Sequence, residues 1–319
     1  MSARAQRWAG VTGLVIGLGL ATAPAIFQMY DRAPAGGDMM VDFEPYMTQS
    51  KVDQFNAYMD TIGAANSESL AARAELVDSG TLTDDEYAAT YAQAASLDEQ
   101  WATIDADMGD MLDRMERNLD NYEAVTSLPP FDLFPFFFVI PGGLIAIAGF
   151  LSFRRGSRRP ALWALLVLGI GLMLAPVAFQ MFTRAPKGAE MIDDFGPMMN
   201  ETRFRNMQMY FITIAGGEGQ LRVSVLPALE AAGGDPVAYG ALTEFSAQWP
   251  EMFRDFNDMV DKMQRNIDNY EAAAAMPSFS LFPWFFLAPG VLVASAAGAA
   301  LRRTRTPDST TQDAGGTPS

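Results

Sequence analysis

The chain has 319 residues, a formal net charge of −16, and a composition that is 50% hydrophobic. It contains neither cysteine nor histidine, which excludes disulfides, zinc or haem ligation by these residues, thiol nucleophiles and Ser-His-Asp triads. No phosphate loop or dinucleotide fingerprint occurs, and basic residues do not cluster away from the apolar stretches described next. We therefore expect no nucleotide or other cofactor and no nucleic-acid partner.

Four apolar stretches are long enough to cross a bilayer, which takes about 20 residues. None contains Lys or Arg, and Asp132, at the edge of the second, is the only acidic residue among them. A soluble helix of this length would normally carry a charged face. The sequence therefore predicts four transmembrane helices, at residues 8–27, 131–153, 161–182 and 281–301.

The first stretch could also be a signal peptide, because Ala21-Thr22-Ala23 resembles a cleavage site. Pro24 would directly follow the cut, where signal peptidases generally do not tolerate proline. A matching stretch also recurs inside the chain, at residues 161–182. We therefore expect the first stretch to be a retained helix.

The arginines predict the orientation of the spans. Nine basic residues flank the spans on one side: Arg4, Arg7, Arg154, Arg155, Arg158, Arg159, Arg302, Arg303 and Arg305. The segments on the other side are acidic, with 21 acidic and five basic residues in 28–130, and 14 and eight in 183–280. The positive-inside rule then places both termini and the loop 154–160 in the cytoplasm of a cell whose plasma or inner membrane holds the chain. Both large segments are expected outside.

The first outer segment predicts a hairpin of two helices. Thr83 followed by Asp84, Asp85 and Glu86 is typical of a capping box. Apolar residues then recur three and four apart as far as Tyr122, which predicts a long helix with a coiled-coil-like seam. Its partner helix is expected to begin near Pro45 and to fade towards Ser79-Gly80.

The second outer segment shows the same pattern. The seam runs from Leu242 to Tyr270, and the run Gly216-Gly217-Glu218-Gly219 is expected to break the partner helix. Trp101 and Trp249 lie on the two seams and are expected to be buried at equivalent positions. Two hairpins packed side by side would form a four-helix bundle.

Two long blocks of the sequence match each other. Residues 23–47 and 175–199 share 14 of 25 positions, and residues 111–142 and 259–290 share 19 of 32. The offsets are 152 and 148 residues, so the second copy is shorter in the middle. This pattern predicts tandem duplication of one span–helical hairpin–span unit, in an all-α membrane protein. The expected organisation is repeat 1 (1–153, outer hairpin 28–130), the basic loop 154–160, repeat 2 (161–301, outer hairpin 183–280) and a disordered cytoplasmic tail (302–319).

A polar cluster near the second span of each repeat is the candidate site. Its members project from one side of each predicted helix. They could bind a cation or a polar ligand, but we favour an architectural role that ties the base of the bundle to the Arg-Ala-Pro turns at residues 32–34 and 184–186. The cluster comprises Arg117, Asn118, Asp120, Asn121 and Glu123, with Arg265, Asn266, Asp268, Asn269 and Glu271 in the second copy.

Methionines and paired carboxylates are further candidates for chemistry. The chain has 20 methionines, and thioethers can bind Cu(I), but most lie on the seams, where methionine ordinarily fills a core. Whether this seam binds Cu(I) stays open. Carboxylate pairs such as Asp105/Asp107, Asp110/Asp113 and Asp193-Asp194 are expected to form a solvated helix face rather than an acid–base pair or a metal site.

These patterns favour a non-enzymatic membrane protein. Its duplicated outer domain would act as a binding, sensing or accessory module with a membrane or extracytoplasmic protein partner, and the chain could form an oligomer. The alternative is a component of a transporter or channel, which suits a parallel repeat. Coupled transport usually requires ionisable residues inside the spans, and the four predicted spans lack them apart from Asp132 at one edge.

Overall fold

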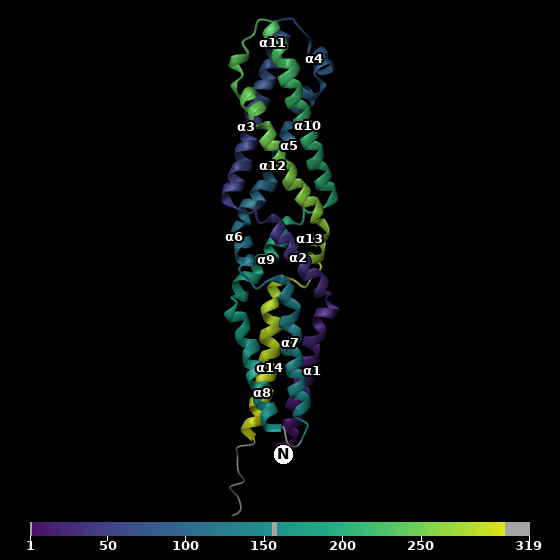
Figure 1. Ribbon diagram of the computed structural model, residues 1–319, viewed down its shortest axis with the longest axis vertical. Coiled ribbons are helices and arrows are strands. Elements are labelled where there is room, and N and C mark those ends of the chain that lie inside the picture. Colours follow the sequence, from purple (N-terminus) through teal and green to yellow (C-terminus); the bar gives the residue numbers. More distant parts are fainter. Residues whose placement is uncertain (1, 155–157, 304–319) are drawn as a thin grey trace, which may run out of the picture. The chain divides into compact units, whose positions relative to one another are not determined.

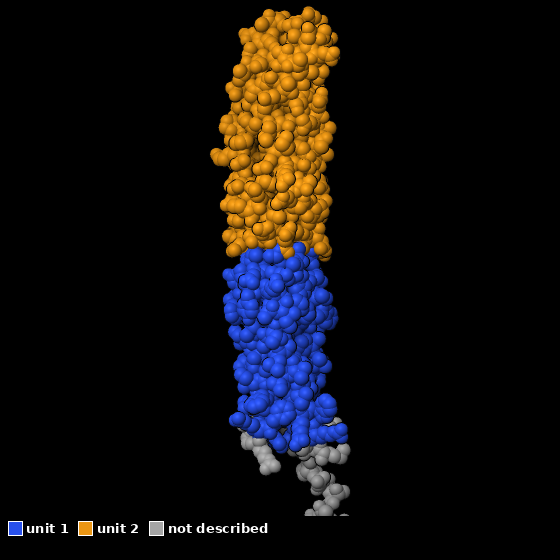
Figure 2. Space-filling model, turned by 90° about the vertical axis from the view of Figure 1, so that its right-hand side faces the viewer, with its two compact units in different colours: residues 1–37, 124–189, 272–319 blue, residues 38–123, 190–271 orange. Residues whose placement is uncertain are grey.

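The computed structural model describes residues 2–154 and 158–303, and every regular element in these ranges is helical (Figure 1). Residues 155–157 of the predicted basic loop and residues 304–319 of the predicted tail lie outside the described residues. The chain forms two compact units (Figure 2). The span unit comprises residues 1–37, 124–189 and 272–319, and the bundle unit comprises residues 38–123 and 190–271. Both predicted repeats therefore contribute to each unit.

Four long helices build the span unit, and all four are long and apolar enough to cross a membrane. The prediction of four apolar helices that are long enough to span a membrane is thus confirmed. Helix α1 packs along α7, and α8 packs along α14, while α1 also contacts α14 and α7 contacts α8 (Figure 1). The bounds are α1 (Ser2–Ile26), α7 (Phe134–Leu151), α8 (Arg158–Ala178) and α14 (Phe282–Arg303), with one 3₁₀ turn before each of α7 and α14 (Phe131–Leu133 and Phe279–Leu281).

Small residues let α1 and α7 approach at backbone distance. A Cβ atom at Gly17 would lie 2.3 Å from the backbone nitrogen of Ala146. A Cβ atom at Gly142 would lie 2.6 Å from the backbone nitrogen of Ala21. Atoms do not approach this closely, so only glycine permits the observed separation of the two helices.

In each half of the chain, a glutamine with a left-handed backbone conformation follows the first apolar helix. Gln28 has φ 54° and Gln180 has φ 52°. Helices α2 (Met29–Phe43) and α9 (Met181–Phe195) begin immediately afterwards. The Arg-Ala-Pro motifs at 32–34 and 184–186 were expected to be turns, but they lie inside these two helices. The turn forms at the glutamine instead, so each proline lies in the second turn of a new helix.

The bundle unit is a four-helix bundle. Its long helices are α3 (Gln49–Asp78), α5 (Ala92–Arg117), α10 (Glu201–Gln220) and α12 (Gly240–Arg265). Helices α3 and α10 each pack against both α5 and α12. The shorter elements are α4 (Asp84–Thr90), α6 (Leu119–Thr126), a π-helical turn (Leu221–Val225), α11 (Leu226–Ala231), a 3₁₀ turn (Pro236–Ala238) and α13 (Ile267–Ala274).

Side-chain caps set the starts of several helices in the bundle unit. The hydroxyl of Thr48 accepts a hydrogen bond from the backbone N–H of Lys51 at the start of α3. The capping box of Thr83 and Glu86 forms as expected at the start of α4. The helix predicted to run from there to Tyr122 is nevertheless interrupted at Tyr91 and again at Asn118. These interruptions divide it into α4, α5 and α6.

The glycine run at residues 216–219 does not break its helix, contrary to expectation. Helix α10 continues to Gln220 and passes into the π-helical turn. A Cβ atom at Gly217 would lie 2.5 Å from a side-chain carbon of Leu97 on α5. Tertiary packing therefore explains the glycine, because the neighbouring helix leaves no space for a side chain.

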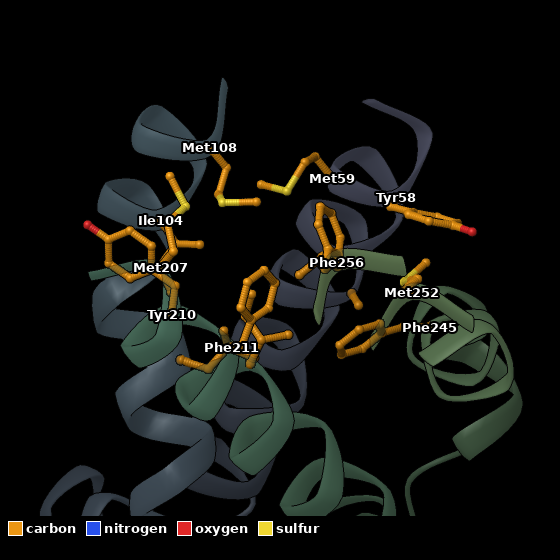
Figure 3. Packing of buried hydrophobic residues seen from close by; sticks show 14 of the residues in the cluster. Tyr58, Met59, Ile104, Met108, Met207, Tyr210, Phe211, Phe245, Met252 and Phe256 are labelled. Carbon is orange, nitrogen blue, oxygen red and sulfur yellow. The ribbon is translucent and has the colours of Figure 1, made fainter. Parts of the chain in front are cut away.

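The core of the bundle unit is apolar and rich in aromatic residues. Phe256 of α12 lies between side chains of α3 and α10 (Figure 3), with its ring centroid 4.9 Å from that of Phe55 and 5.3 Å from that of Phe211. Trp101 and Trp249 were expected inside this core, but both are only partly buried. They pack at its edge, Trp101 against Gly63 and Trp249 against Phe245.

Candidate functional site

An ionic cluster joins α3 to α12 in the bundle unit. Lys51 Nζ lies 2.7 Å from Asp255 Oδ2, and the hydroxyl of Tyr58 donates to the same oxygen at 3.4 Å. Burial acts to raise the pKa of Asp255, but the hydrogen bonds and charges of Lys51 and Arg254 outweigh it, so the pKa is lowered. Asp255 is thus held ionised as a structural partner and is not available as a general acid near neutral pH.

A matching cluster joins α10 to α5. Arg203 Nη1 lies 2.7 Å from Asp107 Oδ2, and the hydroxyl of Tyr210 donates to that oxygen at 2.5 Å. Arg203 and Tyr210 lie 152 residues after Lys51 and Tyr58, and the two carboxylates are 148 residues apart. The pKa of Asp107 is lowered, because these hydrogen bonds outweigh the effect of burial. The same contact therefore occurs on both sides of the bundle, between the first and second halves of the chain.

The predicted polar cluster has two buried members, Asn118 and Asn266. The Nδ2 atom of Asn118 donates to Asp194 Oδ2 at 2.6 Å, and the Nδ2 atom of Asn266 donates to Asp42 Oδ2 at 2.9 Å. Asn121 and Asn269 donate in turn to Asn118 and Asn266. The two asparagines occupy the interruptions after α5 and α12, and each binds a carboxylate from the other half of the chain.

Two basic residues that the sequence analysis did not select complete these carboxylate sites. Lys262 Nζ lies 3.0 Å from Asp42 Oδ1, and Arg114 Nη1 lies 3.1 Å from Asp194 Oδ1. The hydrogen bond from Asn266, followed by that from Lys262, lowers the pKa of Asp42. A detectable signal existed, because Arg114 and Lys262 are basic at matching positions four residues before each asparagine.

The other members of the predicted cluster lie towards solvent. Arg117 is 56% exposed and lies 3.5 Å from Asp194, and Arg265 is 55% exposed and pairs with Asp261 at 2.9 Å. The remaining carboxylates are exposed: Asp120, Glu123, Asp268 and Glu271. The structure thus brings the asparagines to the helix interface and leaves the charged residues of the cluster around its rim.

The arginines of the Arg-Ala-Pro motifs bind backbone carbonyls within the span unit. Arg32 Nη1 donates to the carbonyl oxygen of Ala275 at 2.9 Å. Arg184 Nη1 donates to that of Ser127 at 3.0 Å. The acceptors immediately follow α13 and α6, where helix-end carbonyls need partners. Each arginine therefore connects one half of the chain to the other inside the span unit.

A cavity of about 70 Å³ lies inside the bundle unit. No charged side chain lines it, and the lining is dominated by thioethers and aromatic rings. The sixteen lining residues are Met39, Met40, Phe43, Tyr46, Met47, Met111, Met115, Tyr122, Met191, Ile192, Phe195, Met198, Met199, Met259, Met263 and Tyr270.

The lining is symmetric in sequence. All sixteen residues fall into eight pairs separated by 152 or 148 positions. Six pairs are identical, and four of these are methionine in both copies. Half of the chain's methionines, ten of 20, therefore meet at one place. The seam methionines are recognisable in the sequence, but the space between them is not.

A group of buried polar side chains surrounds Asp98 in the first half of the bundle unit. The hydroxyl of Ser69 donates to Asp98 Oδ1 at 2.8 Å, while Asp98 Oδ2, Tyr87 Oη and Asn66 Oδ1 are buried without a hydrogen-bond partner. Burial raises the pKa of Asp98 to about 6, although the bond from Ser69 acts to lower it. This carboxyl group is therefore poised to change its protonation below neutral pH.

The members of the carboxylate pairs divide between solvent and ion pairs. Asp105, Asp113 and Asp193 are exposed, whereas Asp107 and Asp194 form the ion pairs described above. Within residues 2–154 and 158–303, no three His, Cys, Asp or Glu side chains come together in a way that could hold a metal ion. Thioether ligands are a separate case, because ten methionines line one cavity.

Comparison with known proteins gives no family for the chain. No protein-family model matches the sequence, and no curated protein is significantly similar to it. Any functional conclusion must therefore come from the residues and their arrangement.

Proposed function

We propose that this chain is a non-enzymatic membrane protein whose duplicated outer domain acts as a binding, sensing or accessory module. In this proposal the bundle unit lies outside the cytoplasm, and both termini and the basic loop lie inside. The observation that carries it is the distribution of charge, since arginines flank one end of all four spans while the segments at the other ends are acidic.

We attribute the two halves of the chain to tandem duplication. Support comes from the matching sequence blocks and from contacts that recur at the same offsets. Lys51–Asp255 and Arg203–Asp107 are one such pair of contacts. Each half contributes one partner to each contact, so neither hairpin would complete its interface alone. This interdependence favours a fused two-repeat chain that folds as one bundle.

A binding role fits the chemistry of the bundle unit better than catalysis does. The described residues offer ionised, paired carboxylates rather than a nucleophile beside a base. An accessible cavity and a helical bundle with its own core are features that binding modules use. A transport role has less support, because residues 133–153 and the other three spans lack ionisable side chains.

Cysteine labelling tests the proposed orientation directly, since the native chain has no cysteine to remove. We expect Ser67→Cys, on the exposed face of α3, to react with a membrane-impermeant maleimide on intact cells. Ser157→Cys, in the basic loop, should react only after the cells are permeabilised, and that second reaction is its positive control. Labelling of Ser157→Cys on intact cells, with protection of Ser67→Cys, would refute the orientation and with it the proposed outer domain.

A further inference from the structure

We propose that the methionine-lined cavity of the bundle unit binds the end of an uncharged alkyl chain. The proposal deepens the binding role proposed above by naming the site and the class of ligand, and it rests on that role. The cavity is defined by the sixteen residues given above and lies entirely within residues 38–123 and 190–271.

The polar atoms of the lining are already occupied. The hydroxyl of Tyr122 donates to the carbonyl oxygen of Met40 at 2.6 Å, and that of Tyr270 donates to Ile192 at 2.6 Å. The hydroxyl of Tyr46 donates to Asp258. All three tyrosines line the cavity, and each of their hydroxyls already has an acceptor within the protein. A polar ligand would lose its hydrogen bonds to water on entry, whereas an apolar one loses none.

The volume fits a narrow apolar group. A dry cavity of about 150 Å³ lined by apolar side chains takes up benzene or xenon, and this one is about half as large at about 70 Å³. Methionine has three rotatable side-chain bonds, so a lining rich in it can adapt its shape to an entering chain. Met47 and Phe195, both only partly buried, belong to the lining and leave it incompletely enclosed.

The position of the lining along the chain favours an alkyl chain as the occupant. All sixteen residues fall in four short stretches, 39–47, 111–122, 191–199 and 259–270. Three of these stretches begin or end within about 13 residues of an apolar span in the sequence, and 259–270 overlaps the start of the fourth. Lipid tails and free amphiphiles share the alkyl chemistry, and either source would satisfy the site.

A soft monovalent metal ion is the competing occupant, because thioethers bind Cu(I). The cavity lining contains no carboxylate to offset the charge of a cation. The two ligands require different properties of the lining. A metal ion requires sulfur, whereas an alkyl chain requires only apolar volume.

The test uses the full chain in lipid nanodiscs and two photoreactive probes. One is a phospholipid with a diazirine in its acyl chain, and the other is a free long-chain alcohol with the same diazirine. After illumination and proteolysis, we expect crosslinks to concentrate in the four lining stretches, with either probe or with both. The probe that labels identifies the source of the chain.

Three variants make the result decisive. Met111→Leu keeps the apolar volume and removes one sulfur, so labelling should stay within about twofold of wild type. The double variant Met111→Trp/Met259→Trp fills the space from α5 and α12, and labelling should fall about tenfold. Met209→Trp places the same bulk on an exposed position of α10, where Met209 is 57% exposed, and should leave labelling unchanged. Far-UV circular dichroism confirms that each variant is helical.

Two outcomes would overturn the proposal. The first is labelling by both probes that is no higher in the lining stretches than elsewhere in the bundle unit. The second is stoichiometric Ag(I) binding by wild type that Met111→Leu loses, which would assign the site to a metal. Either outcome leaves the cysteine-labelling test of orientation unaffected, so the failure of this site and the failure of the proposed outer domain are distinguishable.

Discussion

Adjacent glycines in α7 should respond in opposite ways to the same substitution. Gly142 faces α1, and a Cβ atom there would lie 2.6 Å from the backbone nitrogen of Ala21 and 2.8 Å from the carbonyl oxygen of Gly17. Both are backbone atoms of a packed helix, so no side chain can rotate away. Gly143, the next residue, has nothing within 4 Å of its Cβ position.

The magnitudes follow from these distances. An ordinary contact at the Cβ of Gly142→Ala requires α1 and α7 to separate by nearly an ångström, and overpacking of this kind costs about 1–3 kcal/mol. Gly143→Ala meets open space and removes the helix penalty of glycine, which is about 0.5–1 kcal/mol. We therefore expect Gly142→Ala to be the less stable of the two by about 1.5–4 kcal/mol.

Unfolding in one mild detergent, followed by far-UV circular dichroism, measures this difference. The same comparison can be made on α1, where Gly17 contacts α7 closely and Gly19 has an open Cβ position. Gly17→Ala and Gly142→Ala disturb one contact, so the double variant should lose less than the sum of the two. Equal stabilities for Gly142→Ala and Gly143→Ala would refute the close packing of α1 on α7.

Two further predictions concern the bundle unit. Arg114→Ala should cost about 1–3 kcal/mol in thermal unfolding, because the side chain is only 20% exposed and its loss leaves Asp194 short of a partner. The Arg117 side chain is 56% exposed, so Arg117→Ala should cost about 0–1 kcal/mol. A greater loss of stability for Arg117→Ala than for Arg114→Ala would contradict the conclusion that Arg114 is the main partner of Asp194. The raised pKa of Asp98 means that the folded chain retains a proton there which the unfolded chain releases, so stability should fall as pH rises from about 4 to about 6. Partial solvent access limits this fall in stability to about 1–2 kcal/mol. Asp98→Asn should remove it, as measured by unfolding curves over a series of pH values. If stability depends on pH equally in the variant and in wild type, the raised pKa of Asp98 is contradicted.

The spans were the most predictable part of the fold. The second was expected at residues 131–153, and the corresponding apolar helix runs over 131–151. Twenty apolar residues without charge leave few alternatives, so composition alone is sufficient. The same local reasoning failed at Gly217, because the reason for that glycine is Leu97, about 120 residues away in the chain. A propensity for breaking helices is overridden when a neighbouring helix occupies the position of the side chain.

The candidate site was predictable only in part, for a similar reason. The sequence singled out Asn118 and Asn266, which the structure places at the interface between helices. Their partners, Asp194 and Asp42, come from the other half of the chain, and nothing in the local sequence pairs them with the asparagines. The cavity could not be predicted from the seam residues either, because the same run of methionines occurs whether the space between two helices is filled or left open.

Comparing the two halves of the bundle unit distinguishes contacts that the shared fold requires from features that occur in one half. Contacts such as Lys51–Asp255 have a counterpart in the other half, as a shared architecture requires. The buried carboxyl of Asp98 does not, because Ser246 occupies the position 148 residues later. A bundle that folds with serine at one position does not need a buried acid at the other. Replacing Asp98 should therefore change the response to pH without disturbing the scaffold, whereas replacing Asp255 should weaken the bundle at every pH at which that carboxylate is ionised.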